Sequence, residues 1–282
     1  MNDDYELIDS GDGRKLERFG DVKLVRPAGQ AVWHPALPEK IWNDAAAGFD
    51  RDAGNRWHNR HNLPDQWNIS VSGITFNLSS TDFGHLGIFP EQRVMWNWIR
   101  EAVRERKEKT GTVSVLNLFA YSGGSTLAAA QGGAEVCHLD ASKGMVEWAR
   151  ENAALNNLQD VSIRWIVDDA AGFLRRELKR NRHYDAIILD PPSFGRGKKG
   201  EVFKIQEHLP VLLDLCRDLL SENPLFLLLS CHTPEYSPMT LQNLLAQWLK
   251  NSGGKTDCGE MLLTGSAGVM PLPSGAFARW IA

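Results

Sequence analysis

A short apolar strand, a glycine turn, a helix and a second strand follow one another within residues 113–140. The first run, VSVLNLF at 113–119, is apolar with β-branched residues, as expected of a strand buried on both faces. A Gly-Gly pair closes the turn, Ser125 is expected to cap the helix, and the second strand ends at Asp140. Such a unit has a right-handed crossover. The pattern therefore predicts an α/β fold with a Rossmann-like sheet.

The same unit predicts where a ligand binds, because ligands of such sheets lie at the carboxyl ends of the strands. Glycines in the first turn let a ligand approach the backbone, and Asp140 is placed to hold the two hydroxyls of a ribose. The glycine spacing differs from GxGxxG, so no diphosphate site is indicated. The unit alone leaves three interpretations open: S-adenosylmethionine, a dinucleotide, or a purely structural turn.

A second buried strand further along the chain ends in Asp190-Pro191-Pro192-Ser193-Phe194. A proline after an aspartate keeps that aspartate out of helical geometry, and the second proline stiffens the strand exit further. Such a rigid tip can present the Asp190 carboxylate to a planar, nitrogen-bearing substrate on which Phe194 stacks.

Several short patterns recur in a defined order over residues 74–235, and together they are more specific than any single one. They are Phe89, Gln92 and Arg93, then NLFAYSGG at 117–124, Asp140, Asp168-Asp169, and DPPSF at 190–194. The combination resembles the class I S-adenosylmethionine-dependent methyltransferases. The closer resemblance is to the 23S ribosomal-RNA large subunit methyltransferase group that modifies cytosine C5.

This resemblance implies S-adenosylmethionine as the cofactor and assigns roles to individual residues. Tyr121, Ser122 and Gly123 would face the methionine part of the cofactor, Asp140 the ribose, and Asp169 the adenine amino group. The remaining cofactor contacts that it implies are Phe119, Gln92 and Asp190. The residues themselves leave a second interpretation of Asp169 open, because an acid just before AAGFLRRELKR can equally cap a helix.

Two hypotheses compete for the atom that receives the methyl group. Methylation of cytosine C5 needs a thiolate that adds to C6, and Cys231 lies at the end of an apolar strand. The related cytosine enzymes carry Ser-Cys-Ser there, whereas His232 follows the cysteine here, and a buried cysteine can also be a small apolar residue. Methylation of an exocyclic amine needs no covalent intermediate between enzyme and base, because Asp190 can accept hydrogen bonds from the amine.

The candidate catalytic residues are therefore Asp190, Pro191, Pro192, Phe194 and Cys231, with cytosine C5 slightly favoured. A protein or small-molecule substrate stays open as a different class.

Charge gives limited support for an RNA partner. The formal net charge is −4, which argues against simple electrostatic capture of nucleic acid. Arg196, Lys198 and Lys199 follow the DPPSF tip directly, where a substrate phosphate would pass. A second basic run, RRELKRNRH at 175–183, is more simply a solvated helix face.

Residues 1–84 read as a β-rich N-terminal region and residues 85–282 as the methyltransferase domain. The Trp- and His-rich segment 33–67 is most simply a structured surface, and neither it nor the cysteines show metal-ligand spacing. No apolar run reaches the length of a membrane span, and the acidic, polar start is unlike a signal peptide. We therefore expect a cytoplasmic enzyme without a metal.

Overall fold

The structure is a computed structural model that describes residues 3–51, 54–196 and 202–282. The chain divides into two compact units. Unit 1 comprises Met1–Val94 and Leu262–Ser274, and unit 2 comprises Met95–Met261 and Gly275–Ala282. Unit 1 thus contains residues 85–94 and 262–274, which the sequence alone assigned to the methyltransferase domain. The boundary between the two functional domains, placed between residues 84 and 85, remains a prediction.

The centre of unit 2 is a seven-stranded sheet in the order β10-β9-β8-β11-β14-β16-β15. The five strands from β10 to β14 run parallel, and β16 pairs antiparallel with β14. The order reverses beside β8, which is the switch point where ligands of such sheets bind. The strands are β8 (Ser114–Leu118), β9 (Glu135–Asp140), β10 (Ile163–Val167), β11 (Ala186–Leu189), β14 (Phe226–Cys231), β15 (Lys255–Leu263) and β16 (Leu272–Ile281).

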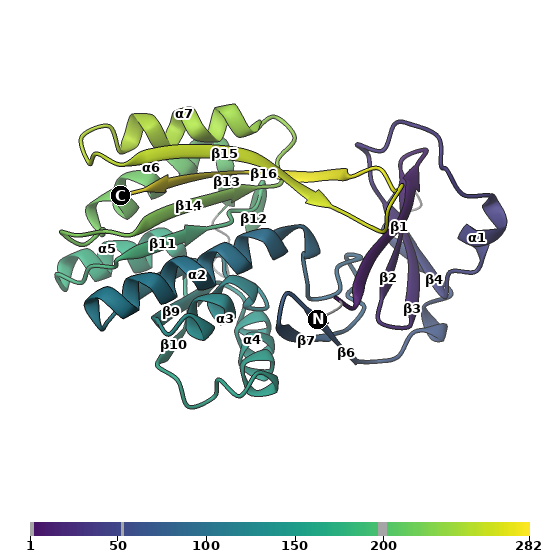
Figure 1. Ribbon diagram of the computed structural model, residues 1–282, viewed down its shortest axis with the longest axis horizontal. Coiled ribbons are helices and arrows are strands. Elements are labelled where there is room, and N and C mark those ends of the chain that lie inside the picture. The colour runs from purple at the N-terminus through teal and green to yellow at the C-terminus, as the bar shows by residue number, and fades with distance from the viewer. Residues whose placement is uncertain (1–2, 52–53, 197–201) are drawn as a thin grey trace. The chain divides into compact units, whose positions relative to one another are not determined.

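Helices cover both faces of this sheet (Figure 1). On one face lie α2 (Arg93–Thr110), α3 (Gly124–Gln131) and α4 (Lys143–Leu155). On the other face lie α5 (Ala170–Lys179), α6 (Ile205–Asp218) and α7 (Pro238–Trp248), which form one apolar core with alternate strand residues such as Leu116 and Leu118. A short hairpin of β12 (Phe194–Arg196) and β13 (Val202–Lys204) precedes α6. The expected Rossmann-like α/β fold is confirmed.

The strand–turn–helix–strand unit forms as the sequence predicts, with one difference at the start of the helix. The N-cap of α3 is Gly123, in the left-handed conformation at φ +96°, and it makes no side-chain cap hydrogen bond. Ser125 lies inside the helix and is buried, so the prediction that it caps the helix is wrong. Glycine adopts this conformation without the steric cost that a Cβ would add, and it can therefore turn the chain more sharply than a serine cap.

Unit 1 is β-rich, as expected for the N-terminal region. Its main sheet has the order β1-β2-β3-β4-β5, and a separate hairpin is formed by β6 and β7. Asp12 and Gly13 both have positive φ in the turn between β1 and β2, which suits a two-residue hairpin loop. The elements are β1 (Tyr5–Gly11), β2 (Arg14–Phe19), β3 (Val22–Pro27), α1 (Glu39–Asn43), β4 (Ala47–Asp50), β5 (Arg56–His58), η1 (Arg60–Asn62), β6 (Trp67–Val71), β7 (Ile74–Leu78) and η2 (Pro90–Gln92).

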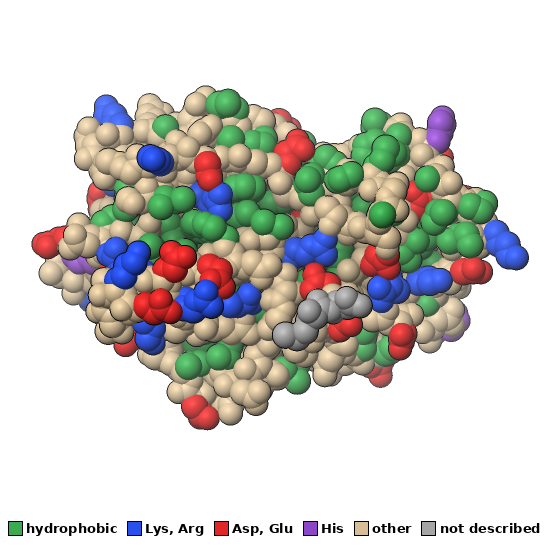
Figure 2. All heavy atoms as spheres, in the orientation of Figure 1, with side chains coloured by type: hydrophobic (Ala, Val, Ile, Leu, Met, Phe, Trp, Pro, Cys, Tyr) green, Lys and Arg blue, Asp and Glu red, His purple; other side chains and the backbone are tan. Residues whose placement is uncertain are grey.

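The surface carries both signs of charge. On the face drawn in Figure 2, Lys and Arg side chains are interspersed with Asp and Glu side chains. In the part of the chain that the structure describes, no helix combines the length and the apolar character needed to cross a membrane.

Candidate active site

The carboxyl ends of the parallel strands meet at one edge of the sheet, and most of the predicted site residues lie there. The turn after β8 holds Phe119 to Gly123, and β9 ends at Asp140. Asp169 follows β10, Asp190 follows β11, and Cys231 ends β14. One edge therefore gathers residues that are far apart in the sequence.

The turn after β8 has an unusual backbone. Phe119 and Tyr121 have φ angles of +56° and +50°, and Gly123 has +96°. Left-handed conformations are costly for large side chains and cluster at ligand sites, where the surrounding structure holds them in place. The Ser122 carbonyl accepts a 2.9 Å hydrogen bond from the side-chain amide of Asn152 in α4. The surrounding structure therefore holds this turn in one backbone conformation.

A buried polar network beneath the turn was not predicted from the sequence. The Asn117 amide donates to the Thr126 hydroxyl at 2.9 Å, and the same hydroxyl lies 2.9 Å from Nδ1 of His138. His138 is fully buried, and this burial lowers its pKa to about 3. Polar residues inside otherwise apolar strands were the signal that could have revealed it, because Asn117 and His138 occupy paired positions in β8 and β9.

Asp140 is held by the backbone. Its Oδ2 accepts the Tyr121 N–H at 3.0 Å and its Oδ1 accepts the Ser142 N–H at 2.8 Å. Burial raises the pKa of this carboxyl, while the two hydrogen bonds oppose the increase. Asp140 thereby connects the end of β9 to the turn after β8, the position at which the sequence predicted a ribose contact.

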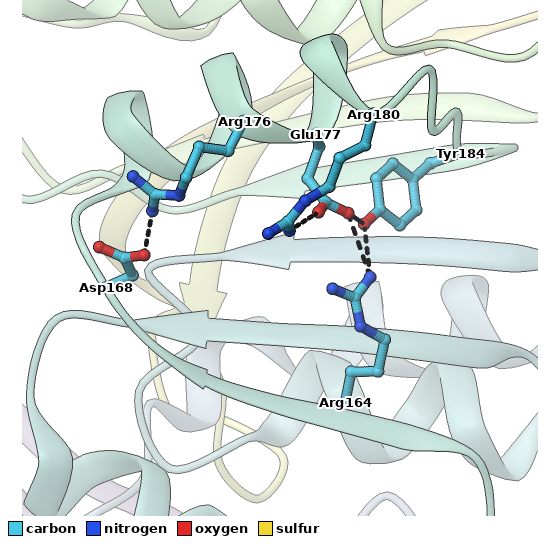
Figure 3. Close-up of polar contacts among 6 residues, drawn as sticks. All are labelled: Arg164, Asp168, Arg176, Glu177, Arg180 and Tyr184. Carbon is cyan, nitrogen blue, oxygen red and sulfur yellow. Dashed lines mark hydrogen bonds and ion pairs between the residues drawn. The ribbon is translucent and has the colours of Figure 1, made fainter.

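Asp169 caps helix α5, because its carboxylate accepts the Gly172 N–H at 2.7 Å. The helix-cap interpretation is therefore correct, and the side chain is also exposed at the site edge. The preceding residue, Asp168, pairs with Arg176 of the same helix (Figure 3).

The DPPSF tip combines a partly buried acid with an exposed ring. Asp190 Oδ1 accepts a hydrogen bond from the Ser230 hydroxyl at 2.8 Å and lies 3.5 Å from Nδ1 of His232. Pro191 is buried, Pro192 is exposed, and the Phe194 side chain is 54% exposed. The tip thus presents an aromatic surface beside a hydrogen-bonded carboxylate.

Cys231 is enclosed at the end of β14, with 1% of its surface exposed. Its Sγ accepts the Thr233 N–H at 3.4 Å. Burial raises the pKa of the Cys231 thiol above its usual value. A nucleophilic cysteine needs access to its substrate and a lowered pKa, so this environment is typical of a structural cysteine.

Gln92 and the basic residues after the DPPSF tip were also predicted from the sequence. Gln92 is buried in η2 of unit 1, whereas the other site residues belong to unit 2. Lys198 and Lys199 lie outside the described residues, and Arg196 ends β12. His58 and His61 of the Trp- and His-rich segment are exposed residues of unit 1.

Comparison with known proteins identifies the family. The sequence model of the S-adenosylmethionine-dependent methyltransferase family matches residues 46–244. A ribosomal RNA large subunit methyltransferase K/L from Shewanella oneidensis is 34% identical over 212 residues, which cover 73% of this chain and 27% of the relative. The chain thus spans about a quarter of the length of that relative.

Two solved structures share the fold of this chain over almost its whole length. The SAM-dependent methyltransferase from Agrobacterium tumefaciens is 41% identical, with a TM-score of 0.92, and the match covers 99% of this chain and 91% of that one. The methyltransferase SMU.776, complexed with SAH, shares the fold at 20% identity and a TM-score of 0.72, covering 99% of this chain and 76% of that one.

Proposed function

Because the chain belongs to the S-adenosylmethionine-dependent methyltransferase family, we propose that it methylates a nitrogen atom of a base in RNA, with ribosomal RNA as the first candidate substrate. The observation that carries the choice of a nitrogen atom is the enclosed Cys231 beside the DPPSF tip, where Phe194 is exposed. The Shewanella relative, a ribosomal RNA large subunit methyltransferase, supports RNA as the substrate class. A ribosomal RNA substrate fits the cytoplasmic location that the sequence predicts.

The residues at the site edge fit S-adenosylmethionine. The turn has three left-handed residues, and a Cβ on Gly123 would lie 3.1 Å from Cβ of Ala149, so a glycine here lets α4 pack closely against the turn. When bound, the cofactor supplies a methyl group carried by a sulfonium sulfur. Tyr121 and Ser122 would line its methionine part, and Asp140 would accept the ribose hydroxyls through lone pairs that its backbone hydrogen bonds leave available.

Asp169 combines its helix cap with a second task in this proposal. One oxygen, Oδ2, accepts the Gly172 N–H, and a carboxylate has acceptor capacity beyond a single hydrogen bond. The exposed carboxylate would then accept a hydrogen bond from the adenine amino group while it continues to cap α5.

Asp190 and Phe194 would position the base that is methylated. Phe194 offers a stacking surface, and Asp190 accepts the amine N–H so that the nitrogen lone pair points toward the methyl group. The rigid prolines hold both residues in one geometry. The amine loses a proton on methylation, and Asp190 together with His232, 3.5 Å away, provides acceptors for it.

Methylation of cytosine C5 is the second candidate, and the position of Cys231 at a strand end is the observation in its favour. That chemistry requires a thiolate that reaches C6 of the base. The buried thiol with a raised pKa makes the nitrogen route the better supported of the two.

Isotope transfer tests the proposal. Purified enzyme is incubated with methyl-labelled S-adenosylmethionine and deproteinised ribosomal RNA, and the nucleosides are analysed by mass spectrometry. We expect label in the RNA, with none when Asp190→Ala replaces the wild-type enzyme. Label in added protein or small molecules, with none in RNA, would refute the RNA substrate.

A further inference from the structure

A cluster of cations lies on and beside helix α5 in unit 2. We name it the α5 basic surface. Its members are Arg164 of β10, Arg175, Arg176 and Lys179 of α5, and Arg180 and Arg182 just after that helix. All of them are exposed except Arg164, which is half-buried.

A buried glutamate organises part of this surface. Glu177 is fully buried and accepts hydrogen bonds from Arg164 and Arg180, each at 3.1 Å, and from the Tyr184 hydroxyl at 2.6 Å (Figure 3). Burial alone would raise the pKa of Glu177, but the hydrogen bonds from Arg164 and Tyr184 outweigh it and lower the pKa. One buried charge therefore fixes two guanidinium groups at the surface.

A second buried glutamate in unit 1 shows what a structural cluster of this kind looks like. Glu17 accepts hydrogen bonds from Tyr5 and Arg26 and pairs with Lys15. The side chains of Arg26 and Lys15 are 9% and 14% exposed, so this cluster is enclosed. The two arginines on Glu177 are instead 36% and 57% exposed. The Glu177 cluster turns its cations toward solvent.

Several cations of the α5 basic surface have no acidic partner among the described residues. Some cations on the other helices of unit 2 pair with an acid of their own helix, as in Arg104 with Glu101, Lys143 with Glu147, and Arg217 with Asp214. Among residues 3–51, 54–196 and 202–282, the side chains of Arg175, Lys179 and Arg182 form no ion pair with an acid. A solvated helix face with balanced charges does not account for this excess.

We propose that the α5 basic surface binds the phosphate backbone of the RNA substrate, an inference that rests on the proposed function. The surface begins beside Asp168, which adjoins the proposed adenine contact Asp169, and α5 extends about 15 Å from there. Guanidinium groups match the geometry of phosphate oxygens, and such contacts position a nucleic acid without reading its sequence. RNA that reaches the site edge therefore has a cationic track along α5.

Direct binding tests this surface independently of catalysis. The variant combines Arg175→Ala, Lys179→Ala and Arg182→Ala, residues whose side chains form no ion pair in the described chain. The matched control combines Arg104→Ala, Lys109→Ala and Lys143→Ala, which removes the same charge from exposed positions on α2 and α4. Affinity for a fluorescein-labelled RNA of mixed sequence is measured by anisotropy over a range of salt concentrations.

We expect the α5 variant to bind RNA about tenfold more weakly at low salt, with a slope of log affinity against log salt that is shallower by about 2. The control should stay close to wild type, and cofactor affinity should be unchanged in both. Equal slopes for the α5 variant and the control would overturn the proposal, as would binding of wild type to anionic vesicles but not to RNA. Absence of methyl label in RNA despite wild-type binding would instead count against the proposed function.

Discussion

Two aspartates at the same sheet edge are held in different ways. Asp140 accepts hydrogen bonds from two backbone N–H groups, whereas Asp190 contacts the Ser230 hydroxyl and the His232 ring. A backbone donor keeps its proton and its position. A hydroxyl or an imidazole can rotate, donate or accept, so it can respond when a neighbouring group changes charge.

This difference matches the tasks that we propose for the two carboxylates. A group that holds the ribose of a cofactor must have one geometry in every cycle. A group that aligns an acceptor nitrogen must tolerate the loss of a proton during methylation. The comparison therefore predicts that replacing Asp140 mainly weakens binding and replacing Asp190 mainly slows turnover.

The largest expected effect is that of Asp190→Ala. Removal of the carboxylate that aligns the acceptor should reduce kcat by about a thousandfold, while calorimetric affinity for the cofactor changes by less than about threefold. Single-turnover methyl transfer measures the first quantity. Ser230→Ala is the control, because it removes one hydrogen bond to Asp190 and should cost much less. A turnover close to wild type in Asp190→Ala would break the comparison.

Asp140→Ala should act on binding. Loss of a hydrogen-bonded charged group should weaken cofactor affinity by about 1.5–3 kcal/mol in isothermal titration calorimetry. At saturating cofactor, kcat should recover most of its wild-type value. Unchanged affinity would remove Asp140 from the cofactor site.

The network beneath the turn gives a prediction about pH. Burial lowers the pKa of His138 to about 3, whereas an unfolded chain binds this proton near pH 6.5. Between these pH values the unfolded state binds more protons than the folded state. With respect to this group, the free energy of unfolding is therefore highest above about pH 6.5 and falls as the pH decreases. At pH 5 the loss is about 2 kcal/mol.

Denaturant titrations at pH 7 and pH 5 measure this loss, and His138→Gln removes the titrating group. The variant should be less stable at pH 7 but should show a flatter dependence on pH. An equally steep dependence in wild type and variant would show that other groups cause it.

Asp169 can be divided into its two tasks by choice of substitution. Serine is a good N-cap but is too short to reach the adenine, so Asp169→Ser should preserve the melting temperature and weaken cofactor binding by about 1 kcal/mol. Asp169→Ala should lose both. Equal cofactor affinity in wild type and Asp169→Ser would leave the cap as its sole role.

The sequence predicts the strands well, because apolar runs mark β8 and β9 and the polar Asp140 marks the end of β9. It does not predict which side chains then meet. Asp190 lies beside Ser230 because Leu189 of β11 pairs with Leu229 of β14, a register between strands some 40 residues apart.

Two further features depend on three-dimensional information. The cap of α3 depends on the left-handed φ angle of Gly123, which residue identity permits but does not require. In the sequence, the α5 basic surface looks like an ordinary charged helix. Only the structure shows that Arg164 of β10 contacts Glu177 of α5. Buried polar partners of this kind are set by packing, and short sequence patterns do not encode them.

The most direct test of the central claim is the identity of the labelled nucleoside formed by wild type and by Cys231→Ala. We predict that both enzymes place the label on a nitrogen of a base in ribosomal RNA, with rates within about threefold of each other, because the buried thiol takes no part. Label in 5-methylcytosine that disappears in Cys231→Ala would contradict the account and establish the cysteine as the nucleophile.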